Sequence, residues 1–285
     1  MVYSNKILLS LFLKSFNYRI KENERLTKVI DIKDVSWERQ KKTILSDLHW
    51  EVSKGEHWAV LGLNGSGKTT LLNMVNGYVW PTTGSVSVLK QPFGKTDIRE
   101  LRKSIGWVSS SLQERIKGTE YAEDIVVSGK YASIGLYENP TEVDSQKAYQ
   151  IMEQVGCSHL IGHTYQICSQ GEKQKVLIAR GLMGSPELLI LDEPSNGLDF
   201  ISREELMSTI NQVAMKKDAP TIIFVTHHIE EILPVFTHTL LLRDGTVFDS
   251  GKRHEVLTSE CLSRFFKKPV KIEWHKERPW MVLRD

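Results

Sequence analysis

The run from Gly62 to Thr69 reads Gly-Leu-Asn-Gly-Ser-Gly-Lys-Thr and contains the residue types that hold the phosphates of a nucleotide. Glycines let consecutive backbone N–H groups converge on phosphate oxygens, while Lys68 supplies a positive charge. The Thr69 hydroxyl is a suitable ligand for Mg²⁺. A short apolar run precedes the loop and a helical pattern follows it, as this chemistry requires. We therefore expect the following residues to bind a nucleoside triphosphate: Gly62, Asn64, Gly65, Ser66, Gly67, Lys68, Thr69 and Thr70.

Two carboxylates end a second apolar run, in which Leu188–Leu191 is followed at once by Asp192 and Glu193. At the end of a buried strand beside a phosphate loop, Asp192 would bind Mg²⁺ together with Thr69. Glu193 would orient or deprotonate an attacking water molecule. Taken alone, the segment also fits a buried strand that ends in two solvated carboxylates.

These groups need a scaffold of short strands and helices. Short apolar runs that alternate with helical patterns predict an α/β fold with a parallel sheet. Ahead of the phosphate loop, Val29–Trp37 and Thr43–Val52 show the alternation of half-buried strands. Residues from about 97 to 168 mix charged and apolar side chains at helical spacing, so we interpret them as an inserted helical subdomain. Thr221–Thr226 is a further expected strand, and a hairpin is expected around Asp244 and Gly245.

Over residues 29–250 the chain resembles the ATPase subunits of ATP-binding-cassette (ABC) transporters. Besides the phosphate loop and the two carboxylates, five segments carry the resemblance, and they occur in the family's order. They are the signature-like Ser169–Gln174, the D-loop-like Ser195–Asp199, the switch histidine His227, the aromatic Trp37, and Ile105–Val108, which resembles the strand leading into the Q-loop. The resemblance implies a P-loop NTPase with a RecA-like core, an N-terminal antiparallel β subdomain and an inserted helical subdomain.

The resemblance also implies a mechanism in which two copies of the chain enclose two ATP molecules head to tail, with Mg²⁺ as the metal. Glu193 would be the general base, and His227 would contact the γ-phosphate and hold the water. Trp37 would stack on adenine, and Asp199 would communicate across the dimer. The signature of the opposite copy would bind the same ATP in trans through Ser169, Gln170, Gly171 and Glu172.

The chain departs from the family pattern at two places. The signature reads Cys-Ser-Gln-Gly-Glu, so that Gln170 and Glu172 add a side chain and a charge where the family usually has Gly and Gln. Slower or differently regulated hydrolysis is one hypothesis for this change. In the Q-loop, the spacing puts Ser110 where a glutamine is usual, and Gln113 is the alternative candidate.

Composition and charge set the remaining limits. Lys and Arg total 37 and Asp and Glu total 35, so the net charge of +2 gives no reason to expect a nucleic-acid partner. The three cysteines form no CxxC pair, which argues against a disulfide scaffold or a zinc site. No apolar stretch of about 18 residues or more is present, so no membrane span is expected.

We expect three segments: a leader at 1–28, an ABC ATPase domain at 29–251 and a C-terminal extension at 252–285. The leader would be disordered or absent from the native protein, since Leu26 could be a UUG start codon and residues 1–25 would then not be translated. The extension is too short for a separate regulatory domain.

Two functions of different classes follow from the resemblance. The first is an ATPase that forms a homodimer and drives transport through a separate transmembrane permease subunit, from the cytoplasmic face of the cell membrane. The second is a soluble ABC ATPase without a membrane partner, acting in translation, repair or regulation. A single phosphate loop and the lack of a long heptad tract favour the first.

Overall fold

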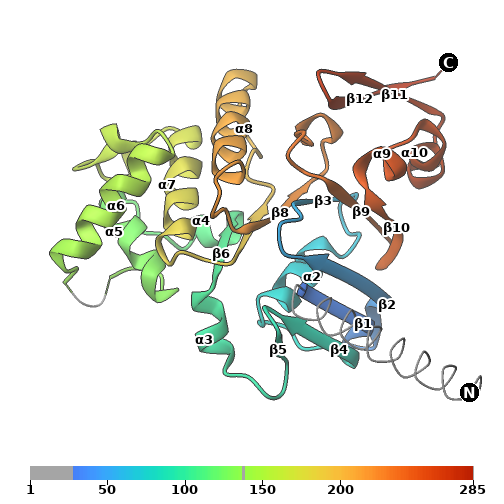
Figure 1. The fold of residues 1–285 in the computed structure, drawn as a ribbon, viewed down its shortest axis with the longest axis horizontal. Coiled ribbons are helices and arrows are strands. Elements are labelled where there is room, and N and C mark those ends of the chain that lie inside the picture. The colour runs from blue at the N-terminus through green and yellow to red at the C-terminus, as the bar shows by residue number, and fades with distance from the viewer. Residues whose placement is uncertain (1–27, 137–138, 285) are drawn as a thin grey trace, which may run out of the picture.

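The computed structural model describes residues 28–136 and 139–284. The predictions for residues 1–25, including the start at Leu26, lie outside this range. Within it, a central sheet is flanked by an antiparallel β subdomain on one side and a helical lobe on the other, while the C-terminal elements cover a third side (Figure 1).

The central sheet has six strands in the order β10-β9-β3-β8-β7-β6, of which only the β9–β10 pair is antiparallel. Every residue of the predicted strand at Thr221–Thr226 is buried, as expected when helices cover both faces of a parallel sheet. The expected α/β fold and the hairpin around Asp244 are confirmed. The strands are β3 (Trp58–Leu61), β6 (Ile105–Ser109), β7 (Leu188–Asp192), β8 (Thr221–Thr226), β9 (His238–Arg243) and β10 (Thr246–Lys252).

The antiparallel β subdomain has four strands in the order β2-β1-β4-β5. Ile30, Ile32 and Val35 of β1 are buried in the core. The apolar residues whose alternation predicted this strand are therefore those on its inward face. This confirms the predicted N-terminal antiparallel subdomain. The strands are β1 (Lys28–Arg39), β2 (Lys42–Ser53), β4 (Thr83–Val88) and β5 (Gln91–Pro92).

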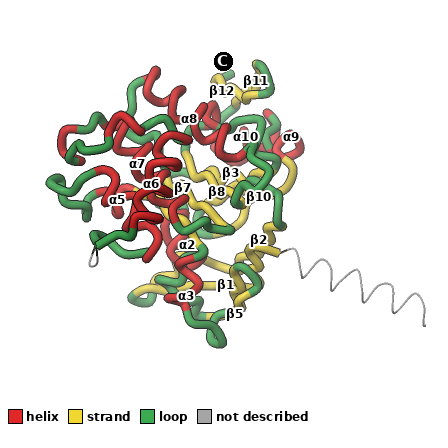
Figure 2. Tube along the Cα trace, turned by 60° about the vertical axis from the view of Figure 1, so that its left-hand side comes forward, coloured by secondary structure: helices red, strands yellow, loops and turns green. Residues whose placement is uncertain are grey.

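The helices form a lobe beside the central sheet and a layer against it (Figure 2). The long helix α7 joins the two parts, because its residues Val176–Ala179 share one buried hydrophobic cluster with the lobe and with β7 and β8. Gly106 of β6 lies so close to the Gly181 carbonyl of α7 that a side chain at position 106 would collide with it. The helices are α2 (Lys68–Val75), α3 (Ile98–Lys103), α4 (Ser110–Gln113), α5 (Ala122–Ser128), α6 (Glu142–Gln154), α7 (Gln170–Met183) and α8 (Phe200–Ala214).

The predicted boundary of the helical insert at about residue 97 differs from the structure. β6 lies inside that range, and it pairs in parallel with β7 at the edge of the central sheet. Residues 105–109 are therefore part of the sheet, which confirms the strand that the resemblance implies at Ile105–Val108, and the helices of the lobe follow Ser109. The division into a domain and a C-terminal extension stays a prediction.

The C-terminal residues pack on the body of the chain. They form the helices α9 (Arg253–Val256) and α10 (Ser259–Phe266) and a hairpin of β11 (Val270–His275) with β12 (Arg278–Leu283). Buried apolar residues of α9, α10 and β11 belong to the same hydrophobic cluster as the sheet and the lobe.

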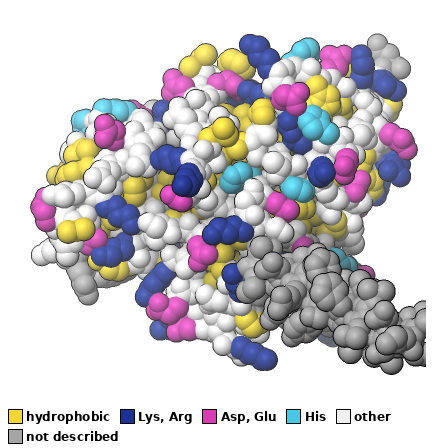
Figure 3. Space-filling view, viewed as in Figure 1, with side chains coloured by type: hydrophobic (Ala, Val, Ile, Leu, Met, Phe, Trp, Pro, Cys, Tyr) yellow, Lys and Arg dark blue, Asp and Glu magenta, His cyan; other side chains and the backbone are white. Residues whose placement is uncertain are grey.

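All three cysteines, Cys157, Cys168 and Cys261, are buried and unpaired. Burial raises the pKa of the Cys157 thiol to about 12 and that of the Cys261 thiol to about 11. In the described part of the chain, no helix combines the length and the apolar character that a membrane crossing requires. On the face drawn in Figure 3, basic and acidic side chains are interspersed.

Candidate functional site

The candidate residues meet at the carboxyl ends of neighbouring parallel strands. The phosphate loop (62–69) follows β3, Asp192 ends β7, and His227 follows β8. The strand register pairs Leu61 with Thr226 and Asp192 with Val225, so these ends lie at one edge of the sheet. This is the edge at which open α/β sheets bind ligands.

The phosphate loop turns directly into a helix. Gly67, with φ +103°, caps α2, and this left-handed backbone is the reason for a glycine immediately before Lys68. Backbone N–H groups at the helix start provide an anion-binding site. A cavity of about 570 Å³ opens there; it is lined by Lys42, Ile44, Asn64, Gly65, Gly67, Lys68, Thr69, Thr70, Ser110, Ser111, Asp192 and Glu193. Gly62 and Ser66, which the motif also named, do not line it.

The Lys68 ammonium group is held over the loop. Its Nζ donates to the carbonyl oxygens of Gly62 at 2.7 Å and Leu63 at 3.3 Å, and it lies 3.4 Å from Glu193 Oε1. The side chain is only 7% exposed, so its charge lies in a medium of low polarity where an anion would be strongly attracted.

Glu193 lies between two other candidate groups. His227 Nδ1 is 3.4 Å from the same Oε1 that approaches Lys68, although the alignment is not that of a hydrogen bond. The Glu193 backbone has φ +49°, and its N–H donates to the Val225 carbonyl at 2.9 Å. This left-handed backbone is uncommon outside glycine and fixes the carboxylate beside β8.

Asp192 carries the electrostatic signature of a cation site. Burial and the neighbouring Glu193 carboxylate raise its pKa to about 6, although Lys68 acts in the opposite direction. A bound cation would offset both effects and keep the carboxylate ionised.

Two buried polar atoms near this edge have no hydrogen-bond partner within the described residues: Ser66 Oγ and His227 Nδ1. Unpaired buried polar groups are uncommon in folded proteins, and a bound ligand can supply the missing partner. With the Thr69 hydroxyl and the Asp192 carboxylate lining the same cavity, the residues present fit a magnesium-bound nucleoside triphosphate.

The two Q-loop candidates lie in different places. Ser110 lines the phosphate cavity, together with Ser111, which the spacing argument did not name. Gln113 lies one helical turn further along α4, and its Oε1 accepts a hydrogen bond from Gln174 at 3.0 Å. Ser110, and not Gln113, therefore lines the phosphate cavity, and which of the two serves as the Q-loop residue stays a prediction.

Trp37 is half-buried on β1 and packs against the apolar core of the antiparallel subdomain. It does not line the cavity, but the register places it opposite Leu45, whose neighbour Ile44 does. Stacking of Trp37 on adenine stays a prediction. Lys42 and Ile44 were missed because nothing in the pattern of β2 separates them from other strand residues.

The signature residues form the first turn of α7. Ser169 caps this helix: its Oγ accepts from the Glu172 N–H at 3.3 Å, and the Glu172 carboxylate accepts from the Ser169 N–H at 2.8 Å. The hydrogen bond from His159 and the Ser169 N–H lower the pKa of Glu172 to about 2. The unusual glutamate thus closes a capping box with Ser169.

The D-loop residue Asp199 caps α8. Its carboxylate accepts from the Ser202 N–H at 2.9 Å and from the Ser202 hydroxyl at 2.7 Å, which lowers the pKa of Asp199. Gln170 shares a surface cavity with Asn196 and Gly197 of the D-loop. None of the four signature residues lines the phosphate cavity, so a single copy does not bring these two halves together.

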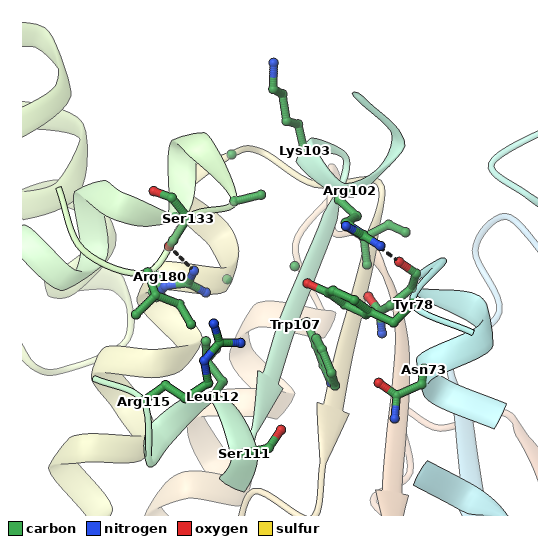
Figure 4. A pocket seen from close by; sticks show the side chains of 18 residues that line it. Asn73, Tyr78, Arg102, Lys103, Trp107, Ser111, Leu112, Arg115, Ser133 and Arg180 are labelled. Atoms are coloured by element: carbon green, nitrogen blue, oxygen red, sulfur yellow. Dashed lines mark hydrogen bonds between the residues drawn. The ribbon is translucent and has the colours of Figure 1, made fainter. Parts of the chain in front are cut away.

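A second cavity, of about 550 Å³, lies between the end of α2, α3 and β6 on one side and the helical lobe on the other (Figure 4). Tyr78 and Trp107 pack against each other on one wall with ring centroids 5.3 Å apart and the ring planes tilted by 40°, and the Arg102 guanidinium lies 3.9 Å from the Tyr78 ring centre. Arg115 and Arg180 lie on the facing wall (Figure 4). The cavity is therefore both aromatic and strongly basic.

The comparison with protein families agrees with this geometry, since the ABC transporter family matches residues 45–196. An uncharacterized ABC transporter ATP-binding protein of Bacillus subtilis, YlmA, is 50% identical, with 89% of this chain and 97% of YlmA covered. The chain belongs to the ABC transporter ATP-binding family. Because ABC ATP-binding proteins are ATPases, this ABC subunit is an ATPase, and the alternative without a membrane transporter is not favoured.

Solved structures support the same assignment of the ABC subunit. An ABC transporter in an inward-facing conformation matches it with a TM-score of 0.73 and 26% identity, over 90% of this chain and 98% of the other. CbiO1 from Clostridium perfringens, part of the ABC transporter complex cbiONQ, matches with a TM-score of 0.71 and 26% identity over 84% and 94%. The predicted P-loop NTPase fold of ABC cassettes is confirmed.

Proposed function

We propose that this ABC subunit hydrolyses ATP in a head-to-tail homodimer and drives transport through a separate membrane subunit. One observation carries the proposal: the phosphate cavity brings Lys68, Asp192 and Glu193 to one edge of the sheet, beside His227. The substrate of transport is not part of the proposal.

In this mechanism the phosphate loop and Lys68 hold the β- and γ-phosphates, with the Lys68 ammonium moving from loop carbonyls to phosphate oxygens. Thr69 and Asp192 would hold Mg²⁺, which neutralises phosphate charge when bound. Glu193 accepts a proton from the attacking water, and His227 keeps that water and the γ-phosphate in place. Trp37 and Ser110 would contact the adenine end and the metal side of the nucleotide.

The dimer is supported by the separation of the two half-sites. At the α7 start, Ser169 and Gln170 are exposed and Gly171 is half-buried, and none of the three lines the phosphate cavity of its own chain. Phe200 and Ile201, the first residues of α8 after the D-loop, are 59% and 64% exposed. Because these apolar side chains are exposed beside the signature half-site, which lies apart from the phosphate cavity of its own chain, contact with a second copy would bury them and complete both sites.

The hydrolysis step is tested with Glu193→Gln, and Glu187→Gln is the matched control. Glu187 precedes β7 and is exposed, whereas Glu193 follows it. Glu193→Gln should bind ATP but lose hydrolysis by about 10²–10⁴-fold, and light scattering should detect an ATP-dependent dimer. Glu187→Gln should hydrolyse at the parent rate. Parent-like hydrolysis by Glu193→Gln would refute the role of Glu193.

The membrane subunit would dock in the aromatic and basic cavity of Figure 4. The arginines on its walls fit a cytoplasmic segment that carries an acidic side chain, and Tyr78 and Trp107 fit an apolar side chain beside it. A subunit bound in this way would be peripheral on the cytoplasmic face of the membrane.

Arg115→Glu tests this docking, because Arg115 is exposed and lines the cavity. Lys217→Glu makes the same charge change at an exposed residue outside the cavity. We expect Arg115→Glu to lower the amount of subunit that co-sediments with membranes of the source cell, with ATP hydrolysis unchanged. Equal co-sedimentation of both variants would contradict docking at this cavity.

A further inference from the structure

The segment that carries His227 is held from two sides by groups that the proposed mechanism does not use. This switch turn, residues 227–231, follows β8 and ends in the short 3₁₀ turn at Ile229–Glu231. Its outer side faces the C-terminal hairpin, and its inner side faces the D-loop.

On the inner side, Glu231 is fully buried. Its Oε1 accepts from the Ser195 hydroxyl of the D-loop at 2.7 Å, and its Oε2 accepts from the Thr226 hydroxyl at the end of β8 at 2.5 Å. The Thr226 oxygen in turn accepts from the His228 N–H at 3.0 Å. One buried carboxyl group therefore joins the D-loop to both flanks of His227.

On the outer side, Arg278 of β12 reaches the same turn. Its Nε and Nη2 donate to the Glu230 carbonyl at 3.0 and 2.6 Å, so the guanidinium binds the backbone of the turn directly. Its Nη1 and Nη2 also form a bidentate pair with the Glu204 carboxylate of α8, and this pairing lowers the pKa of Glu204. Such paired donation needs the planar fork of arginine.

The hairpin that supplies Arg278 is itself fixed to the body of the protein. Arg253 of α9, which is 7% exposed, donates to the Glu277 carbonyl at 2.6 Å and to the Glu277 carboxylate at 2.9 Å. Ile272 and Trp274 of β11 pack against the main hydrophobic cluster. The position of Arg278 is therefore set by the fold.

We propose that Arg278 is a positioning residue for ATP hydrolysis, through which the C-terminal hairpin holds the switch turn and so aims His227 at the reaction site. A side chain anchored to α8 and bonded to the Glu230 carbonyl limits how far this turn moves. Glu231 fixes the other side of the turn to the D-loop. This inference rests on the proposed role of His227.

The test compares Arg278→Lys and Arg278→Gln with Lys271→Gln. Lysine keeps the charge for Glu204 but loses the forked donation to the Glu230 carbonyl. Lys271 lies in the same hairpin and pairs only with the exposed Glu273 among the described residues, so its change is the matched control. We expect kcat for ATP to fall about three- to tenfold in both Arg278 variants. KM should change less than twofold, and Arg278→Lys should melt within a few degrees of the parent. Lys271→Gln should match the parent.

A thermodynamic cycle with His227→Ala separates the two claims. If Arg278 acts through His227, the double variant His227→Ala/Arg278→Lys will be no slower than His227→Ala alone. A parent-like rate for His227→Ala would refute the proposed role of that histidine. A slow His227→Ala with a parent-like, folded Arg278→Lys would instead overturn the inference about Arg278, as would additive losses in the double variant.

Discussion

The hydroxyl of Thr226 offers a quantitative test of the network around the switch turn. Thr226 is 1% exposed, and its Oγ1 forms both the bond to Glu231 and the bond from the His228 N–H. Thr226→Val keeps the shape of the side chain and replaces this oxygen with a methyl group. The variant leaves one oxygen of Glu231 and one backbone N–H without partners.

The size of the effect follows from these two bonds. Each of the two buried hydrogen bonds contributes about 0.5–1.5 kcal/mol, so we expect a loss of about 2 kcal/mol in the free energy of unfolding. For a chain of this size, that loss lowers Tm by about 3–4 °C.

The control lies at the other end of the same strand. Thr221 is 3% exposed, and its Oγ1 is buried without a hydrogen-bond partner among the described residues. Thr221→Val should therefore change the free energy of unfolding by less than about 0.5 kcal/mol, or should stabilise the protein. Urea denaturation of both variants, with equal m-values required, measures the difference. Equal destabilisation by the two changes would refute the assignment of the Thr226 network.

Three further outcomes are expected. Because burial raises the pKa of Asp192 to about 6, the proton competes with Mg²⁺ in acid, and the Mg²⁺ concentration for half-maximal ATP hydrolysis should rise between pH 7 and pH 5; an unchanged requirement would contradict a metal role for Asp192. Gln113→Ala should leave KM for ATP within twofold in steady-state kinetics because its side chain bonds to Gln174, whereas Ser110→Ala should raise KM severalfold; the reverse order would restore Gln113 as the Q-loop residue. Gln170→Gly should raise kcat for ATP by opening the α7 start to the opposite copy, and an equal kcat and KM would rule out the effect proposed for this signature residue.

The sequence was informative where chemistry and strand patterning coincide. Apolar runs that end in Asp192 or in His227 predicted both the strands and their shared edge, because parallel strands bring their carboxyl ends together. It was less informative at β6, a five-residue strand that contains Gly106 and lies within a stretch of helical spacing. Only the family resemblance indicated a strand at Ile105–Val108, and the parallel pairing with β7 explains why the segment is one.

The remaining features of the site depend on the direction in which side chains point and on contacts between residues far apart in the sequence. Sequence spacing gives the number of residues between two positions but not the directions of their side chains. In the structure, Gln113 of α4 hydrogen-bonds to Gln174, whereas Ser110 lines the phosphate cavity. Arg278 and the Glu230 carbonyl lie 48 residues apart. No periodicity links an arginine of a terminal hairpin to a backbone atom beside a histidine, so this contact is visible only in the fold.

The three buried cysteines have a practical consequence for measuring motion in this protein. Thiol-reactive labels attack the thiolate, and burial both hides Cys157, Cys168 and Cys261 and raises the pKa of each thiol. A new cysteine at an exposed position of α6, such as Val143, would therefore take a fluorophore or spin label selectively. Distances between the helical lobe and the sheet could then be followed through the ATP cycle in the natural cysteine background.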